Sequence, residues 1–497
     1  MTNRDNMGDS SRVELPPVLT SHYLDEHRTD VDMAEYVREN YLEMLSNVNA
    51  DEKPDMCISM AMTLGYYADG FGNDTYRIPL DRAQMEITRI GINSLYIANE
   101  GDGLAFRPGT KNEGKVKADV AYKMGELYLL YAYSLDRCNR PLESMAFLDY
   151  AEKQFLRLLS VLRAAGVDEK DLFIAKEKYE ECRAKEADNW YRMFDYLNES
   201  IQLPMMFCID SYYRHSIDEF MKMGSEENAD FYYRKLCEFS LHYLNNYGKI
   251  DPSAISGIEY KETDYDKYEE WCWNNHLYLN IMDEVPNYNP DWVKDDLVFD
   301  LSESGNLLVR DIISTFDHCR RLMHRYTRIP EEIRFAKERD EDVESLLDCY
   351  FRLYSILDKT AKIINELYPQ SSELNGQITF KEVVSNLWSN SNQFLRGIYQ
   401  INRDLFPQRD DYKKMTIAPF LKIVGTSLWF STIRNDLTHS AIEIVPPNVE
   451  LNIVKGTTHI CARDLEFYIV RMTCLVREVL LNLQLAVNYD KRQKKKP

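Results

Sequence analysis

Apolar residues recur at helical spacing along most of the chain. In residues 118–135 they share one face of a predicted helix, and Gly125 leaves room there for a close neighbour. The next segment opens at Pro141, a favoured first-turn residue, and stops at Gly166. The face-sharing residues of the first segment are Ala121, Met124, Tyr128 and Tyr131, and those of the second are Leu148, Ala151, Phe155, Leu159 and Leu162. The two segments predict a helical hairpin with a Cys-Asn-Arg connection.

Similar pairs follow one another from residue 31 to residue 250. This pattern predicts an irregular α-helical array of tetratricopeptide-like character, although no strict repeat of about 34 residues aligns over three units. One interpretation is a concave surface for a protein partner. The other is a helical layer that only packs on the next domain.

Two segments lack this helical pattern, one before it and one after it. Residues 1–30 are polar, contain Pro16 and Pro17 and show no periodicity, which predicts a flexible N-terminal arm. Residues 251–305 are rich in Asp, Asn, Pro and Tyr and predict a connector. Its aromatic run Tyr268–Asn280 indicates that the connector is docked on the following helices. His276 within this run is a candidate proton-transfer group, but a structural role is the simpler interpretation.

The helical pattern resumes at residue 306 and extends to residue 490. A first helix is expected from Asn306, and a second ends before Pro369. A third follows a Thr379–Glu382 capping box, and three more are expected over residues 393–406, 414–437 and 463–487. Between the last two, Ile442 and Ile444, then Leu451 and Ile453, alternate around Pro446-Pro447, which predicts a small β-hairpin insertion. The expected fold class is therefore all-α: a helical array followed by a helical bundle, with residues 491–497 as a basic tail.

Charge divides the chain into two unlike parts. The net charge is −21, which argues against a nucleic-acid partner for the chain as a whole. Residues 301–497, however, hold 28 Lys and Arg against 25 Asp and Glu, which leaves 32 against 56 for residues 1–300. The acidic excess therefore belongs to the N-terminal part, and the C-terminal part is compatible with an anionic partner.

Other features narrow the class of protein. The ten cysteines are scattered without a Cys-x-x-Cys pair, so neither a disulfide framework nor a zinc site is expected. No run approaches the roughly 20 apolar residues of a membrane span, and the N-terminus lacks a secretory signal. We therefore expect a cytoplasmic protein with no membrane contact, no metal and no cofactor.

The strongest chemical candidate lies in residues 431–440, Ser-Thr-Ile-Arg-Asn-Asp-Leu-Thr-His-Ser. Asn435 and His439 are four residues apart and share a helix face, and the long side chain of Arg434 can reach toward them. Arg434 offers paired donors to a phosphate, and His439 can transfer a proton near neutral pH. Asn435 can donate to a phosphate oxygen or hold the imidazole. An Arg and a His near a helix C-terminus can also simply stabilise the helix dipole and cap.

The Arg-Asn-x-x-x-His pattern, placed at a helix end before one more helix, resembles the HEPN superfamily. The subfamily that joins a tetratricopeptide-like N-terminal region to a C-terminal HEPN domain is the nearest in organisation. Further similarity lies in the connector around Trp271-Cys272, in the run Phe351–Asn365 and in Asn402–Phe406. The sequence departs from the subfamily at Thr438, where an acidic residue is common.

This resemblance implies a metal-independent endoribonuclease that cleaves RNA through attack of the ribose 2′-OH. It implies a homodimer formed through the HEPN domain and a role as a toxin or in defence against phage. Arg434 and Asn435 would then bind the RNA phosphate, and His439 would act in proton transfer. The alternative is a non-catalytic helical module that binds RNA or protein, or that dimerises.

Overall fold

The computed structural model describes residues 113–248, 267–284, 295–329, 340–369, 378–406, 441–445 and 457–495, with a few isolated positions before residue 113. Two compact units divide the chain. The first comprises residues 1–134, 150–179 and 417–423, and the second comprises residues 135–149, 180–416 and 424–497.

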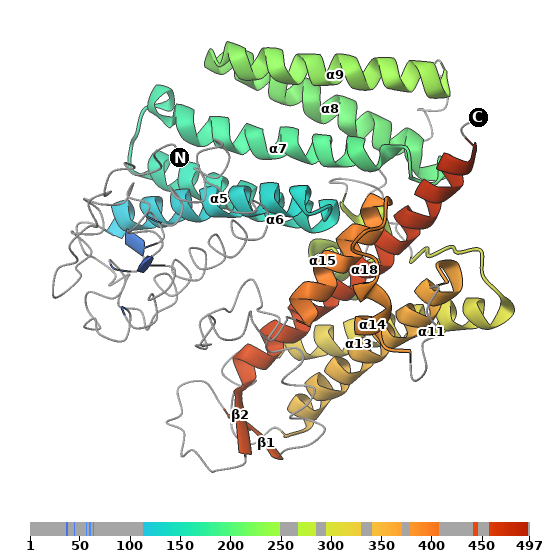
Figure 1. Cartoon of the computed structure of the whole chain (residues 1–497). Helices are drawn as coiled ribbons and strands as arrows, with labels where there is room; N and C mark the ends of the chain where they lie inside the picture. The colour runs from blue at the N-terminus through green and yellow to red at the C-terminus, as the bar shows by residue number, and fades with distance from the viewer. Residues whose placement is uncertain are drawn as a thin grey trace, which may run out of the picture. The chain divides into compact units, whose positions relative to one another are not determined.

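Helices dominate the described residues (Figure 1). In chain order they are α5 (Glu113–Arg137), α6 (Pro141–Ala164), the 3-10 turn η2 (Glu169–Leu172), α7 (Phe173–Phe194), α8 (Glu199–Met223), α9 (Glu226–Tyr247), α10 (Lys267–Asn274), η4 (Ile281–Glu284), α11 (Glu303–Thr327), α13 (Asp340–Leu367), α14 (Phe380–Ser385), α15 (Gln393–Leu405) and α18 (Ala462–Lys495). The two strands are β1 (Ala441–Val445) and β2 (Thr457–Cys461).

Several helix boundaries lie where the sequence predicts them. α6 begins at Pro141 and ends two residues before Gly166, whose positive φ of 78° suits a glycine. Thr379 caps α14, since its hydroxyl accepts a hydrogen bond from the Glu382 N–H and donates to the Glu382 carboxylate. In the first unit, a Cβ on Gly125 would lie 2.8 Å from the Phe155 ring, so the predicted close approach at this glycine is confirmed.

The second unit has a continuous apolar core. α11 and α13 pack together, as do α8 and α9, and α18 packs on both α13 and α15. In Figure 1, α15 lies alongside α18, the long helix that ends the chain. α11 contributes Ile312, Phe316 and Cys319 to the core, and all three are fully buried. The tetratricopeptide-like arrangement of the N-terminal helices stays a prediction, as do the domain boundaries.

The strand predicted around Ile442 and Ile444 is present as β1, but the predicted hairpin is wrong in direction. The predicted residues Leu451 and Ile453 lie outside the described residues; β2 comprises Thr457–Cys461 and pairs with β1 in parallel, with Ala441 opposite Thr457 and Val445 opposite Cys461. Pro446-Pro447 ends β1 because proline cannot donate to a strand ladder. Parallel pairing needs a connection of about a dozen residues, and residues 446–456 supply nearly that length.

Candidate active site

The predicted site residues Arg434, Asn435 and His439 lie outside the described residues. Their convergence, and the expected helix 414–437, therefore stay predictions. The described structure begins again two residues after His439, at β1, and β2 leads directly into α18. The segment that carries the motif is thus joined, through the two paired strands, to α18, which is the longest described helix and has 34 residues.

A buried cluster of charged side chains joins α15 and α18 to the turn before α6. Arg140 has no exposed surface and bonds Asp404 of α15, with Nη1 2.6 Å from Oδ2. It also contacts Glu143, and its Nε lies 3.7 Å from the Glu478 carboxylate of α18. Arg471 of α18 contacts Glu143 from the other side. Burial raises the pKa of Glu478, because a carboxylate loses hydration there, although Arg140 and Arg471 oppose the rise.

The turn that carries Arg140 approaches α15 very closely. Asn139 has a φ of 59°, a left-handed conformation that asparagine adopts more readily than most residues. Its carbonyl oxygen lies so near Gly397 that a Cβ at that position would overlap it. A glycine is therefore required at this point of α15.

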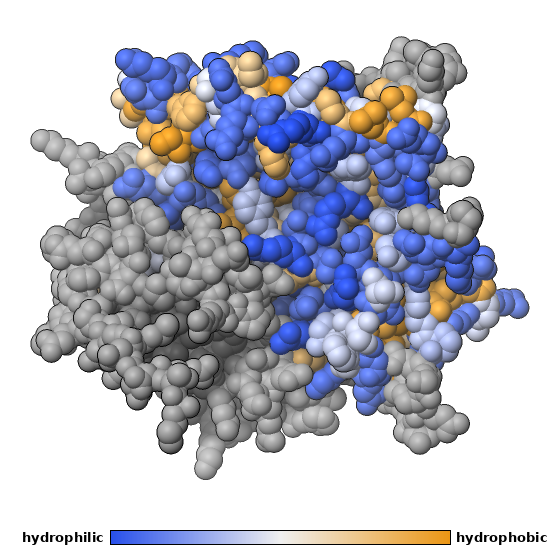
Figure 2. Space-filling model, turned by 45° about the horizontal axis from the view of Figure 1, so that its top comes forward, coloured by the Kyte–Doolittle hydropathy of each residue, from blue (hydrophilic) through white to orange (hydrophobic). Residues whose placement is uncertain are grey.

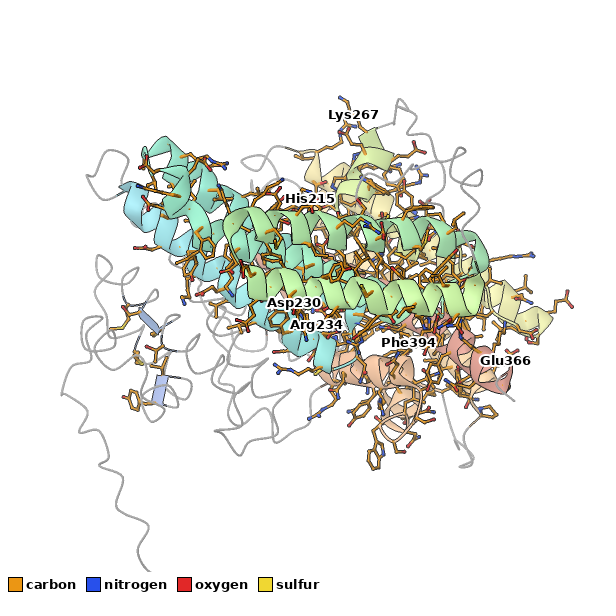
Figure 3. The ribbon with its side chains drawn as sticks, turned by 90° about the horizontal axis from the view of Figure 1, so that it is seen from above. His215, Asp230, Arg234, Lys267, Glu366 and Phe394 are labelled. Atoms are coloured by element: carbon orange, nitrogen blue, oxygen red, sulfur yellow. The ribbon has the colours of Figure 1, made fainter. Side chains whose placement is uncertain are left out.

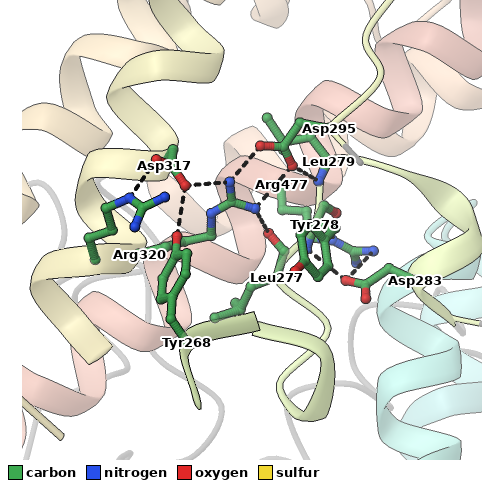
Figure 4. Close-up of polar contacts among 10 residues, drawn as sticks. Tyr268, Leu277, Tyr278, Leu279, Asp283, Asp295, Asp317, Arg320 and Arg477 are labelled. Carbon is green, nitrogen blue, oxygen red and sulfur yellow. Dashed lines mark hydrogen bonds and ion pairs between the residues drawn. The ribbon is translucent and has the colours of Figure 1, made fainter. Parts of the chain in front are cut away.

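Arg320 of α11 holds one side of the connector (Figure 4). Its guanidinium donates to the Leu277 carbonyl oxygen at 2.9 Å and to both Asp295 carboxylate oxygens, and it also reaches Asp317 at 3.1 Å. Burial opposes the charge of Arg320, but the Asp295 carboxylate outweighs that effect and raises the pKa of Arg320. The guanidinium therefore stays charged although only 2 % of the residue is exposed.

Arg477 of α18 holds the other side (Figure 4). It donates to the carbonyl oxygens of Tyr278 at 2.7 Å and Asn280 at 3.3 Å, and it lies 3.5 Å from the Asp283 carboxylate. Asp283 in turn accepts from the Tyr278 N–H. These contacts fix residues 277–283 against both helices, because backbone carbonyls buried there find charged donors.

His276 belongs to the same structural arrangement. One of its ring nitrogens lies 2.7 Å from the carbonyl oxygen of Asp283, and its φ is 50°. The structural interpretation of this histidine agrees with these contacts.

The last turns of α18 dock on α7 and α9. Arg492 bonds the Asp195 carbonyl oxygen at 2.8 Å, its guanidinium pairs with the Asp195 carboxylate at 3.1 Å, and it donates to Tyr247 Oη at 2.6 Å. Asp195 also accepts from the ring of His242 at 2.7 Å. α18 thus connects the strand pair at one end with the α7–α9 layer at the other.

Two further kinds of feature, a cluster of metal ligands and a membrane-spanning helix, are absent from the described residues. They contain no group of three or more His, Cys, Asp or Glu arranged to hold a metal ion. None of their helices is both long and apolar enough to cross a bilayer. On the face drawn in Figure 2, the described residues are mainly hydrophilic, with apolar residues in separate patches.

The helices α11, α13, α14, α15 and α18, together with β1 and β2, form the region in which a family comparison succeeds. Residues 306–490 match the family model described as LA2681-like HEPN. The C-terminal part of the chain therefore carries a domain of the HEPN superfamily. The HEPN match includes positions 434–439 and stops short of the N-terminal helices, so the tetratricopeptide-like subfamily stays a prediction. No match was found among curated proteins or among solved structures.

The buried charges that hold the HEPN region were not predicted from the sequence. Arg471, Arg477 and Glu478 stand within a largely apolar stretch of α18, and this is the one signal that a sequence offers for buried ion pairs. Their partners, Glu143, Asp283 and Arg140, lie far away along the chain, so no local pattern identifies them.

Proposed function

We propose that this protein is a metal-independent endoribonuclease of the HEPN type. The observation that carries the proposal is the Arg434-Asn435-x-x-x-His439 motif inside the region that matches the HEPN family model. A motif of six residues alone is compatible with a simple helix end. Its place directly before the strand pair and α18, inside a HEPN-type bundle, favours a functional site.

The proposed reaction is a transesterification of RNA. The ribose 2′-oxygen attacks the adjacent phosphorus and loses its proton, while the bond from phosphorus to the 5′-oxygen breaks and that oxygen gains a proton. The products are a 2′,3′-cyclic phosphate and a 5′-hydroxyl end. His439 transfers a proton, Arg434 holds the phosphate charge, and Asn435 positions the phosphate or the imidazole. The RNA supplies its own nucleophile, so this route requires no metal.

The reaction moves two protons, and each chain has one motif. A homodimer that brings two copies of His439 to one RNA would supply both groups, so we propose dimerisation through the HEPN domain. A role as a toxin or an anti-phage effector follows from the HEPN resemblance, and the N-terminal helices would then bind a protein partner.

Cleavage of RNA in EDTA tests the proposal. Purified protein is expected to cut labelled single-stranded RNA with excess EDTA present, and His439→Ala is expected to lower the rate at least about a hundredfold, the usual contribution of a general acid or base. His215→Ala is the matched control, because His215 lies exposed on α8 (Figure 3). Equal cutting by the wild type and His439→Ala would contradict the assignment. RNA binding without cutting in any of the three proteins would favour the non-catalytic module.

A further inference from the structure

The C-terminal half of α11 reverses the charge of the chain. Residues 318–328 contain four arginines and two histidines but no Asp or Glu, in a protein of net charge −21. Arg320 and His324 point into the protein, since they are 2 % and 9 % exposed. The other three arginines lie on the surface.

Arg321, Arg325 and Arg328 follow one another at intervals of four and three residues. This spacing places them on one face of the helix. Arg321 pairs with Asp317 at 2.8 Å. Within the part of the chain that the structure describes, neither Arg325 nor Arg328 has an ion pair, so both charges are available to a ligand.

Two aromatic side chains of α10 border this row of arginines. Tyr268 and Trp271 each lie 5.4 Å from the His324 ring, measured between ring centres. The Arg321 guanidinium lies 4.4 Å from the centre of the Tyr268 ring. Both aromatic residues are half-buried, so part of each side chain is exposed. We call Tyr268, Trp271, Arg321, Arg325 and Arg328 the α10–α11 face.

The acidic groups near this face indicate which end binds an anion. Glu269 and Glu270 are exposed on α10, beside Tyr268 and Trp271, and Asp317 neutralises Arg321. Lys267, at the start of α10, projects away from the ribbon (Figure 3). The unneutralised positive charge therefore lies at the Arg325 and Arg328 end.

We propose that the α10–α11 face binds single-stranded RNA, with phosphates on Arg325 and Arg328 and a base stacked on the exposed part of Trp271. Arginines recognise phosphate through paired donors, and an aromatic ring stacks on unpaired bases of any sequence. The positive charges of Arg325 and Arg328 are complementary to the phosphates of RNA, and a protein surface with few acidic side chains would not match them. This inference rests on the proposed function, since it assigns a substrate contact outside the motif.

The test measures RNA binding by fluorescence anisotropy in the full-length His439→Ala background, which removes cutting. Arg325→Glu/Arg328→Glu is expected to weaken binding at least about tenfold. The salt dependence is expected to flatten by about 0.7 in log Kd per log salt for each phosphate that the variant no longer binds. Arg214→Glu/Arg234→Glu is the matched control, because both arginines are exposed on α8 and α9 and each pairs with an Asp four residues earlier. Figure 3 labels Arg234 and its partner Asp230.

Trp271→Leu separates stacking from charge. It keeps an apolar side chain against α11 and is expected to lower affinity without changing the salt dependence. Its thermal unfolding temperature, measured beside the parent, shows whether the fold is kept. A duplex RNA of the same sequence is expected to bind more weakly, because its bases are not free to stack.

The outcomes separate this inference from the proposed function. Equal loss of affinity in Arg325→Glu/Arg328→Glu and in the control pair overturns the α10–α11 face, as does unchanged affinity in both, whether or not the wild type cuts RNA. Selective loss in Arg325→Glu/Arg328→Glu without any cutting by the wild type supports the face and overturns the nuclease. Absence of RNA binding in every protein overturns both.

Discussion

Gly397 shows how one residue decides whether two segments can meet. Its Cα faces the Asn139 carbonyl oxygen, and this oxygen belongs to a backbone that cannot rotate away as a long side chain would. The same turn positions Arg140 beside Asp404. The contact at Gly397 is therefore a condition for the buried ion pair.

Gly397→Ala is expected to lower the free energy of unfolding by about 1–3 kcal/mol, the usual result of forcing extra atoms into a packed contact. Urea unfolding followed by circular dichroism measures it. Gln400→Ala on the same helix is the control, since Gln400 is only half-buried and the change removes atoms instead of adding them. Equal stability of Gly397→Ala and the wild type would mean that the turn does not sit against α15.

The raised pKa of buried Glu478 leads us to expect a specific pH dependence of the protein's stability. It faces Arg140, Arg471, Arg477 and Asp404, and burial leaves its pKa above the ordinary value of 4.5. Because the folded pKa is raised, the stability from this group is complete below about pH 4.5 and falls as pH rises through the folded pKa. Glu478→Gln keeps a neutral side chain of the same size. Its unfolding temperature, relative to the wild type, is therefore expected to rise with pH over this window, whereas Glu303→Gln at the exposed start of α11 is expected to show no such trend.

At the scale of elements, the connector depends on two buried arginines from different helices. Arg320 comes from α11 and Arg477 from α18, and both bond backbone carbonyls of residues 277–280. Hydrogen bonds from a charged donor to a buried carbonyl are stronger than neutral ones. Residues 277–283 of the connector are therefore part of the folded second unit.

Arg320→Met is expected to destabilise the protein by about 3–5 kcal/mol, because it leaves the Asp295 carboxylate without its buried partner. Hydrogen exchange measured by mass spectrometry is expected to increase first in residues 277–296. Arg352→Met is the matched control: Arg352 pairs with Asp348 on the exposed side of α13, where such a pair contributes at most about 1 kcal/mol. Similar exchange in both variants would contradict the role of Arg320.

Elements with local signals were predicted from the sequence, and those set by distant contacts were not. Pro141, Gly166 and the Thr379 cap define helix ends through their own backbone chemistry, so their positions follow from the sequence. The direction of β2 depends on where the chain returns after Pro446-Pro447, which alternation alone does not specify. The α18 helix extends eight residues beyond the predicted end, up to Lys495, where Arg492 docks on Asp195.

At the scale of the whole molecule, the family match and the folding unit differ in extent. The HEPN match begins at residue 306, whereas Arg140, Glu143 and the connector all bond helices inside the match. The candidate motif was predicted from residue chemistry and from resemblance, because six adjacent residues contain their own signal. The buried ion pairs and hydrogen bonds that stabilise the surrounding bundle could not be predicted, because each joins residues that lie in different segments of the sequence.

Residues 306–497 produced alone are therefore expected not to fold cooperatively. This segment loses Arg140, Glu143, Asp283 and Asp295, which pair with Asp404, Arg471, Arg477 and Arg320. Each broken buried pair costs roughly 3–5 kcal/mol against a typical total of 5–15 kcal/mol. Calorimetry is expected to show no sharp unfolding transition for this segment. A segment of residues 113–497 keeps the partners and is expected to show one. A sharp transition of 306–497 near that of the longer segment would show that the HEPN region folds without the turn at Arg140 and without the connector.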